Sequence, residues 1–171
     1  MVNISIHLRP EKKYMINLIG TYEGNIDDKG RVMLPVDFIN QLKTAKELKN
    51  GFVIKTSVFH DCLELYPMTE YSNTIKEINI LNRFVAKNND FIRAFTAGIK
   101  QITLDGTARL LIPKDLLKSA GIKKPVVFSS HVNVIEIWDR SKYYQTIAKS
   151  KKNFAKLAEE VMGKLGNKQI Q

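Results

Sequence analysis

The residues best suited to chemistry are charged and occur twice, at one spacing, in two segments with the composition of hairpin tips. Residues 26–35 read Ile-Asp-Asp-Lys-Gly-Arg-Val-Met-Leu-Pro, and residues 104–113 read Leu-Asp-Gly-Thr-Ala-Arg-Leu-Leu-Ile-Pro. In both, an Arg follows an Asp by four residues. The planar guanidinium group of Arg presents a fork of donors that matches a phosphate or the edge of a guanine. The repeated pattern therefore indicates anion or base binding at two related tips.

The first tip, Asp27-Asp28-Lys29-Gly30, has the residue types of a tight β-turn. Asp at the first position can bond back to the backbone, and Gly at the last tolerates positive φ. Lys29 and Arg31 are the candidate DNA-binding residues here, and Asp27 and Gly30 are expected to shape the loop. A purely structural alternative is an internal pair between Asp27 and Arg31 that only pins the turn.

The second tip repeats the arrangement, with Arg109 as the candidate DNA-binding residue and Asp105 as the residue that shapes the loop. The recurrence favours a functional interpretation, because two copies of one turn do not both need an ion pair merely to fold. The second tip carries one basic residue where the first carries two, so the first is expected to contribute more to binding.

The elements that must position these tips also repeat, which indicates one structural unit built twice and paired about a pseudo-twofold axis. Each copy predicts a strand, a turn, a strand, a short helix, two strands and then a longer helix. The helical patterns follow the prolines, and the paired strands lie at 52–54 and 63–66 in the first copy and at 126–128 and 135–138 in the second.

The chain divides into five predicted segments. They are a loosely held N-terminal segment (1–19), a first repeat (20–68), a helical connector (69–98), a second repeat (99–140), and a C-terminal amphipathic helix with a frayed tail (141–171). In the connector, the spacing of apolar residues predicts a helix over 69–87, broken at Asn88-Asn89, and a second helix over 90–97. The pattern over 141–165 predicts one continuous helix.

Composition limits the classes of partner. A net charge of +10 and a pI near 9.6 favour a polyanionic partner. Residues 22–71, however, contain six basic and eight acidic residues. Only the local cluster Lys29-Gly30-Arg31 therefore marks the first repeat as a nucleic-acid binder. The single cysteine, Cys62, suits a reducing compartment and rules out an intrachain disulfide. No apolar run has the length of a membrane span, and no apolar secretory core opens the chain. We therefore expect no membrane partner and a cytoplasmic location.

Catalysis is not expected. The three histidines, His7, His60 and His131, lie far apart, and His60-Asp61-Cys62 is the only suggestive cluster. The sequence contains no metal-ligand spacing, phosphate loop or dinucleotide fingerprint. We predict no catalytic residue, no metal, no cofactor and no small-molecule substrate.

Both Asp-x-x-x-Arg loops, each followed by three apolar residues and Pro, resemble those of the MraZ family, bacterial transcriptional regulators with two AbrB-like units per chain. Further similarity lies in Tyr22-Glu23, in Leu65-Tyr66-Pro67-Met68, in Arg93-Ala94-Phe95 and in Ile135-Glu136-Ile137-Trp138, and it spans about residues 20–143. The resemblance implies a mainly β fold with helices, a swapped-hairpin, double-split β-barrel formed by two repeats as an intrachain pseudo-dimer.

The same resemblance implies a sequence-specific, repressor-type regulator that acts at the nucleoid. It would assemble as a homo-oligomeric ring and bind short direct repeats in double-stranded DNA of its own promoter, ahead of a cell-division and cell-wall gene cluster. The chain departs from the family in its second loop, where Ala108 stands at a position that is Gly in the family. Because Gly106 stands earlier in that loop, a tighter turn centred on Asp105-Gly106 is expected.

An alternative function is an antitoxin-like or scaffold protein-interaction module built on the same barrel. Such proteins carry one copy per chain and an extended tail that wraps a partner. The two fused copies and the helical C-terminal pattern argue against it.

Overall fold

The computed structural model describes residues 16–166, with side chains described as far as Gly163. The first repeat contains β1 (Thr21–Gly24), β2 (Arg31–Met33), α1 (Val36–Thr44), a short 3-10 turn (Leu48–Asn50), β3 (Phe52–Thr56) and β4 (Cys62–Pro67). The second contains β5 (Lys100–Ile102), β6 (Arg109–Leu111), α4 (Lys114–Ser119), β7 (Val126–His131) and β8 (Val134–Asp139). The order of strands and short helices predicted from the sequence is therefore present in both copies.

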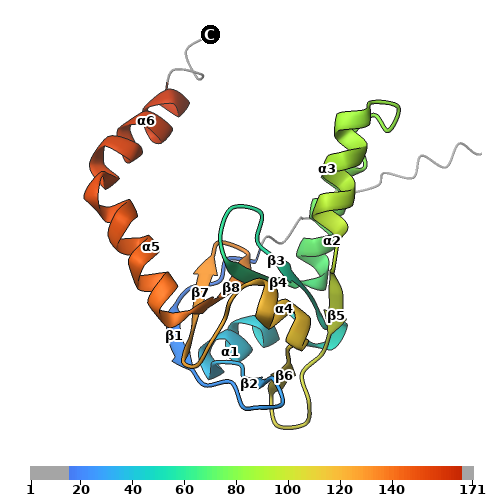
Figure 1. Cartoon of the computed structure of the whole chain (residues 1–171), viewed down its shortest axis with the longest axis vertical. Coiled ribbons are helices and arrows are strands. Elements are labelled where there is room, and N and C mark those ends of the chain that lie inside the picture. Colours follow the sequence, from blue (N-terminus) through green and yellow to red (C-terminus); the bar gives the residue numbers. More distant parts are fainter. Residues whose placement is uncertain (1–15, 167–171) are drawn as a thin grey trace, which may run out of the picture.

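The strands form two separate sheets, and each sheet combines both repeats. The larger has the order β1-β7-β8-β4-β3-β5, and the smaller is the pair β2-β6. Thus β1 of the first repeat pairs with β7 of the second, while β5 of the second pairs with β3 of the first, all antiparallel. At the centre, β4 lies beside β8 with Glu64 opposite Glu136. The fold is mainly β with helices, built from two repeats whose outer strands are exchanged (Figure 1).

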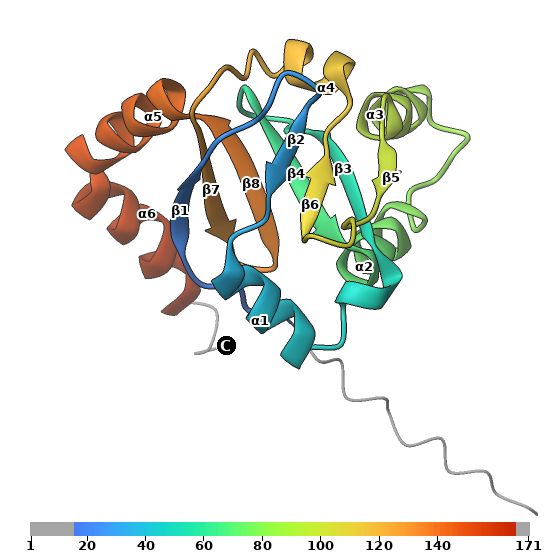
Figure 2. The same cartoon turned by 90° about the horizontal axis from the view of Figure 1, so that it is seen from below.

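The core lies between the two sheets and the two short helices. Alternation along the strands sends Leu63, Leu65, Ile135 and Ile137 to this side, where they are fully buried. Val32 and Leu110 of the small sheet pack onto the same cluster, as do apolar residues of α1 and α4. The two-stranded sheet is therefore a rigidly backed platform, which Figure 2 shows from below.

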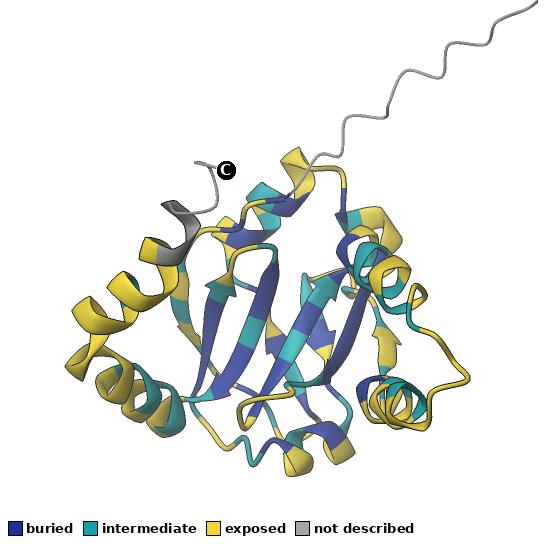
Figure 3. Ribbon diagram, turned by 90° about the horizontal axis from the view of Figure 1, so that it is seen from above, coloured by how far each residue is buried: buried dark blue, intermediate teal, exposed yellow. Residues whose placement is uncertain are grey.

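Two pairs of helices extend from the other side of the large sheet like the arms of a V (Figure 1). The connector forms α2 (Met68–Ile78) and α3 (Ala86–Thr96), and the C-terminal segment forms α5 (Arg140–Lys152) and α6 (Phe154–Gly166). Viewed from above, the central strands of the large sheet carry mainly buried and intermediate residues, whereas the arms are largely exposed (Figure 3). Every helix in residues 16–166 is too short or too polar to pass through a lipid bilayer.

The arms differ from the sequence-based predictions in where their helices break. The predicted break at Asn88-Asn89 is wrong, because both residues lie inside α3. Their amide side chains donate to the Asn82 and Arg83 carbonyls, which belong to the turn before the helix. The connector breaks instead between Asn79 and Val85, and the predicted single C-terminal helix is interrupted at Asn153.

Part of the predicted N-terminal segment 1–19 lies outside the described residues. Within its described part, Ile16 and Leu18 are buried, and the Leu18 N–H donates to the Val132 carbonyl at 2.7 Å. Residues 16–18 are thus held by the core rather than loosely, because both apolar side chains belong to the core cluster and the Leu18 backbone is bonded to the turn between β7 and β8.

Candidate nucleic-acid interface

The first tip is a four-residue turn organised by the carboxylate of Asp27. The Gly30 N–H donates to the Asp27 carbonyl at 3.0 Å, and Gly30 has a φ of +88°. One carboxylate oxygen, Oδ1, accepts from the Lys29 and Arg31 N–H groups at 2.9 Å each. The other, Oδ2, accepts from Arg31 Nε at 2.7 Å. One acidic side chain therefore fixes both the loop backbone and the direction of the arginine.

The second tip has the same geometry. Asp105 Oδ1 accepts from the N–H groups of Thr107 and Arg109, and its Oδ2 accepts from Arg109 Nε at 2.8 Å. The tighter turn predicted for Asp105-Gly106 is wrong. Ala108 itself adopts a φ of +59°, and its N–H donates to the Asp105 carbonyl at 3.0 Å, as Gly30 does in the first tip.

These hydrogen bonds keep both aspartates ionised. The backbone N–H of Arg31 is the largest cause that lowers the pKa of Asp27, to about 2, with further contributions from the Arg31 side chain and the Lys29 N–H. The pKa of Asp105 is lowered for the same reason, first by the Arg109 N–H. Each Asp–Arg pair thus persists as a pair of charges over the whole physiological pH range.

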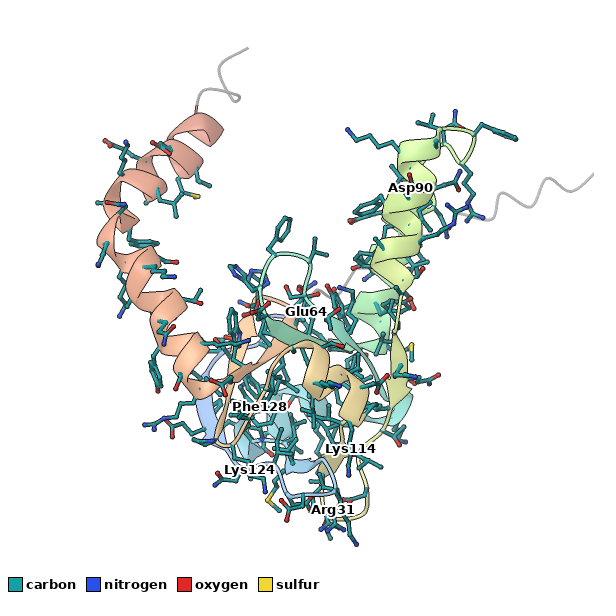
Figure 4. The ribbon with its side chains drawn as sticks, viewed as in Figure 1. Arg31, Glu64, Asp90, Lys114, Lys124 and Phe128 are labelled. Carbon is teal, nitrogen blue, oxygen red and sulfur yellow. The ribbon has the colours of Figure 1, made fainter. Side chains whose placement is uncertain are left out.

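The pairing of β2 with β6 brings the two tips onto one surface. Arg31 lies opposite Leu111, and Met33 lies opposite Arg109, with the buried pair Val32 and Leu110 between them. Since side chains alternate along a strand, the four flanking residues share the outer face of the two-stranded ribbon. Diagonal neighbours of this kind lie about 7–8 Å apart, so the two arginines are close together. Figure 4 shows Arg31 at one end of the molecule.

Both arginines remain available to an external group. Their side chains are 37% and 38% exposed, and within the described residues only Nε of each has an acceptor, which leaves the Nη atoms free. Lys29 is exposed and has no ion-pair partner among the described side chains. An arginine anchored by Nε and open at its Nη atoms is preorganised to bind a phosphate or a guanine edge.

Three residues around the tips are not evident as site residues from the sequence. Met33 and Leu111 are large apolar side chains that are 60% and 58% exposed on the outer face of the ribbon. Their matching places in the two repeats are the signal that could have identified them. Asp28, counted only as a turn residue, pairs with Lys124 at 2.5 Å across 96 residues of sequence, a contact that no local pattern reveals.

The cluster His60-Asp61-Cys62 lies on the opposite side of the large sheet, with His60 and Asp61 in the turn between β3 and β4 and Cys62 at the start of β4. Cys62 is fully buried, and burial, followed by the charge of Glu136, raises the pKa of its thiol to about 12. Asp61 pairs with Lys142 at 3.0 Å. The thiol therefore stays protonated at neutral pH and is a poor nucleophile. Among residues 16–166, no group of three His, Cys, Asp or Glu side chains could hold a metal ion.

Comparison with known proteins adds evidence on ancestry. A family model described as "MraZ protein, putative antitoxin-like" matches the chain twice, at residues 18–94 and 95–165. A protein of Christiangramia forsetii named "Transcriptional regulator MraZ" is 58% identical over 87% of this chain and 95% of its own length. Proteins of the same name from Flavobacterium psychrophilum and Bacteroides fragilis are 54% and 36% identical, over 90% and 86% of this chain and 96% and 92% of their own lengths.

Proposed function

The chain belongs to the MraZ family, and on that basis we propose that it is a transcriptional regulator that binds double-stranded promoter DNA in a sequence-specific manner. The residues proposed to contact DNA are Lys29, Arg31 and Arg109. Asp27, Gly30 and Asp105 hold the loops in shape.

One observation carries this proposal, namely the chemistry of the outer face of the β2–β6 ribbon. Two partly exposed arginines and two exposed apolar side chains occupy neighbouring positions on it. The major groove of B-DNA is wide enough to admit a two-stranded ribbon. It offers guanine acceptors that suit Arg and thymine methyl groups that suit apolar side chains such as Met33 and Leu111.

The finer features follow from the family resemblance. We propose a ring of identical subunits that binds short direct repeats upstream of its own gene, represses a cell-division and cell-wall gene cluster, and works at the nucleoid in the cytoplasm. The six-stranded and two-stranded sheets would be the two parts of a double-split barrel. A ring fits the small number of basic groups at each tip, because repeated sites raise affinity by about 10²–10⁴-fold through effective concentration.

The primary test is a gel-shift titration of the full chain with the DNA immediately upstream of its gene and with a scrambled fragment of equal length. Replacing Arg31 by Ala should cost about 1–3 kcal/mol per contacted base pair and should lower the preference for the upstream fragment. Arg109→Ala should cost less, because its loop has no second basic residue. Arg83→Ala, a change in the exposed turn between α2 and α3, serves as the matched control.

Mass measurement by light scattering on the same samples checks the assembly. The wild type and both loop variants should give the same multiple of the 19.5 kDa chain mass. Unchanged affinity of Arg31→Ala for the upstream fragment, with assembly intact, would remove the proposed function. A more damaging effect of Arg109→Ala would reverse the ranking of the two loops.

The protein-interaction alternative rests on the antitoxin-like description of the family model and on the exposed apolar residues of α6, among them Phe154, Val161 and Met162. A stoichiometric partner protein that co-purifies with the chain, together with no shift of upstream DNA, would favour this alternative over DNA binding.

A further inference from the structure

The two tips have the same turn geometry but stand in different surroundings. Each tip rests on the other repeat. The Ile112 N–H donates to the Gly30 carbonyl at 2.9 Å, while the Leu34 N–H donates to the Ala108 carbonyl at 3.1 Å. The first tip therefore lies beside the start of α4, and the second lies beside the start of α1.

The residues at matching positions of the two repeats differ in charge. The first helical residue after the proline is Lys114 beside the first tip but Val36 beside the second. Two residues before the next strand stands Lys124 in the second repeat and Asn50 in the first. Lys114 and Lys124 are exposed, and we call this pair the lysine flank. At these two positions the first tip has basic neighbours, whereas the second tip has uncharged ones.

The lysine flank is in electrostatic contact with the first tip. Lys124 Nζ lies 2.5 Å from Asp28 Oδ1. The hydrogen bond from Lys124 is the main cause that lowers the pKa of Asp28, and the charge of Lys114 adds to it. Asp28 is the second residue of the turn, and the matching residue of the second tip is the uncharged Gly106. The tip with the additional carboxylate is thus the tip with lysines from the opposite repeat beside it.

Folding does not explain this pair. The Asp28 side chain is 97% exposed and that of Lys124 is 50% exposed, and ion pairs in water contribute little to stability. A bare carboxylate at a tip that approaches DNA would repel the phosphates. A lysine that neutralises it removes that repulsion, and a second lysine beside it adds attraction.

We infer that the lysine flank is a phosphate-binding part of the DNA interface, in which Lys114 and Lys124 contact the sugar–phosphate backbone beside the bases read by the first tip and Lys124 also neutralises Asp28. This inference rests on the proposed DNA-binding function and extends it. Lysine acts as a point charge, so these contacts fix the position of the protein on the duplex without reading sequence. Figure 4 shows Arg31, Lys114 and Lys124 at the same end of the molecule.

The test is the salt dependence of binding. The affinity of the full chain for the upstream fragment and for the scrambled fragment is measured by fluorescence anisotropy from 50 to 200 mM salt. Each lost phosphate contact should make the slope of log affinity against log salt shallower by about 0.9 per bound subunit. Lys114→Ala and Lys124→Ala should each make this slope shallower and should weaken binding to both fragments by the same factor. Arg31→Ala should instead reduce the ratio between the two fragments.

Lys149→Ala is the matched control, since Lys149 is an exposed lysine on α5, far from the tips. One outcome is that the wild type prefers the upstream fragment while Lys114→Ala and Lys124→Ala show the same salt slope as Lys149→Ala. In that case the lysine flank has no role in binding, and the proposed function stands. If the wild type itself shows no preference and no salt-dependent binding, the proposed function fails and the inference fails with it.

A double-mutant cycle tests the neutralising role of Lys124 separately. Asp28→Asn should strengthen binding, because it removes a carboxylate that repels the phosphates. Lys124→Ala should then weaken binding by a smaller factor in the Asp28→Asn background than in the wild type. Equal factors in the two backgrounds would overturn the neutralising role.

Discussion

The Asp27 carboxylate joins loop structure and chemistry in one side chain. It accepts hydrogen bonds from two backbone N–H groups and from the Nε of Arg31, so the backbone of the tip and the arginine proposed to contact DNA cannot move independently. The structural and functional interpretations of the Asp–Arg pair are therefore compatible. The pair is half exposed rather than buried, and it restrains the arginine without consuming its Nη donors.

The Asp27 carboxyl should titrate far below an ordinary aspartate. Its pKa is lowered to about 2 in the folded chain, against about 3.9 for an unperturbed Asp. Its contribution to stability is thus complete above about pH 4 and is lost as the pH falls through about 2. Carboxyl NMR should show Asp27 still ionised at pH 3, and Asp27→Asn should flatten the pH dependence of unfolding in this window. Titration of Asp27 near pH 4 would contradict the network.

Exchanging Gly and Ala at the two positions with positive φ should affect stability to different extents at the two tips. In Gly30→Ala the new Cβ would come 2.6 Å from the Ile112 carbonyl oxygen, and we expect a loss of about 1–3 kcal/mol. In Ala108→Gly a strained φ is relieved at some cost in chain entropy, with an expected net change within about 1 kcal/mol. Urea unfolding measures both, and an equal loss in the two variants would contradict this account.

At the scale of elements, the central strands carry a polar cluster on the face away from the core. Lys55 of β3 is 2% exposed, lies 3.3 Å from Glu64 of β4, and stands over the ring of Phe95 of α3 at 4.7 Å. Glu64 also accepts from Ser57 and Tyr66. One lysine therefore joins two strands and the first helical arm.

Lys55→Met should destabilise the fold by about 3 kcal/mol, because removing one partner of a buried pair leaves the other charge uncompensated. The loss should appear as a lower urea midpoint and as faster hydrogen exchange in α3. Lys49→Met, at an exposed position, should change the midpoint little. A variant of Lys55 as stable as this control would show that Glu64 is satisfied by Ser57 and Tyr66 alone.

The order of elements was predictable from sequence because it depends on local signals, namely alternation in Ile135–Trp138 and its copy Leu63–Tyr66 and the proline before each short helix. The error in the connector arose where hydrogen bonds of individual side chains decide the conformation. Asn88 and Asn89 stay helical because the preceding turn accepts their side chains.

The candidate site shows the same division. The charged residues of the tips and their turn-forming types could be read from the sequence. The positive φ of Ala108, whose carbonyl accepts from Leu34, could not. Nor could the contact between Asp28 and Lys124, because nothing local relates two residues 96 positions apart.

At the scale of the whole molecule, the exchange of outer strands makes the two repeats dependent on each other. β1 finds its partner only in the second repeat, and β5 finds its partner only in the first. The β2–β6 ribbon and the core beneath it also need both.

Neither half should therefore fold alone. A fragment of residues 1–98 and a fragment of residues 99–171 should each lack cooperative unfolding. Mixed after denaturation, they should recover the circular dichroism spectrum of the intact chain, since the missing link at 98–99 lies outside both sheets. A cooperative transition in either separate fragment would show that a repeat is an independent domain.

The link between the repeats has one more consequence. In a dimer of identical chains, a substitution changes both halves at once, whereas here Asp28, Lys114 and Lys124 could change one tip while Gly106, Val36 and Asn50 remained at the other. The scaffold is therefore nearly symmetric, but its two tips differ, which gives the molecule a direction. If the chain binds a duplex through both tips, as proposed, it would distinguish one direction along the DNA from its reverse, which suits targets arranged in tandem rather than as palindromes.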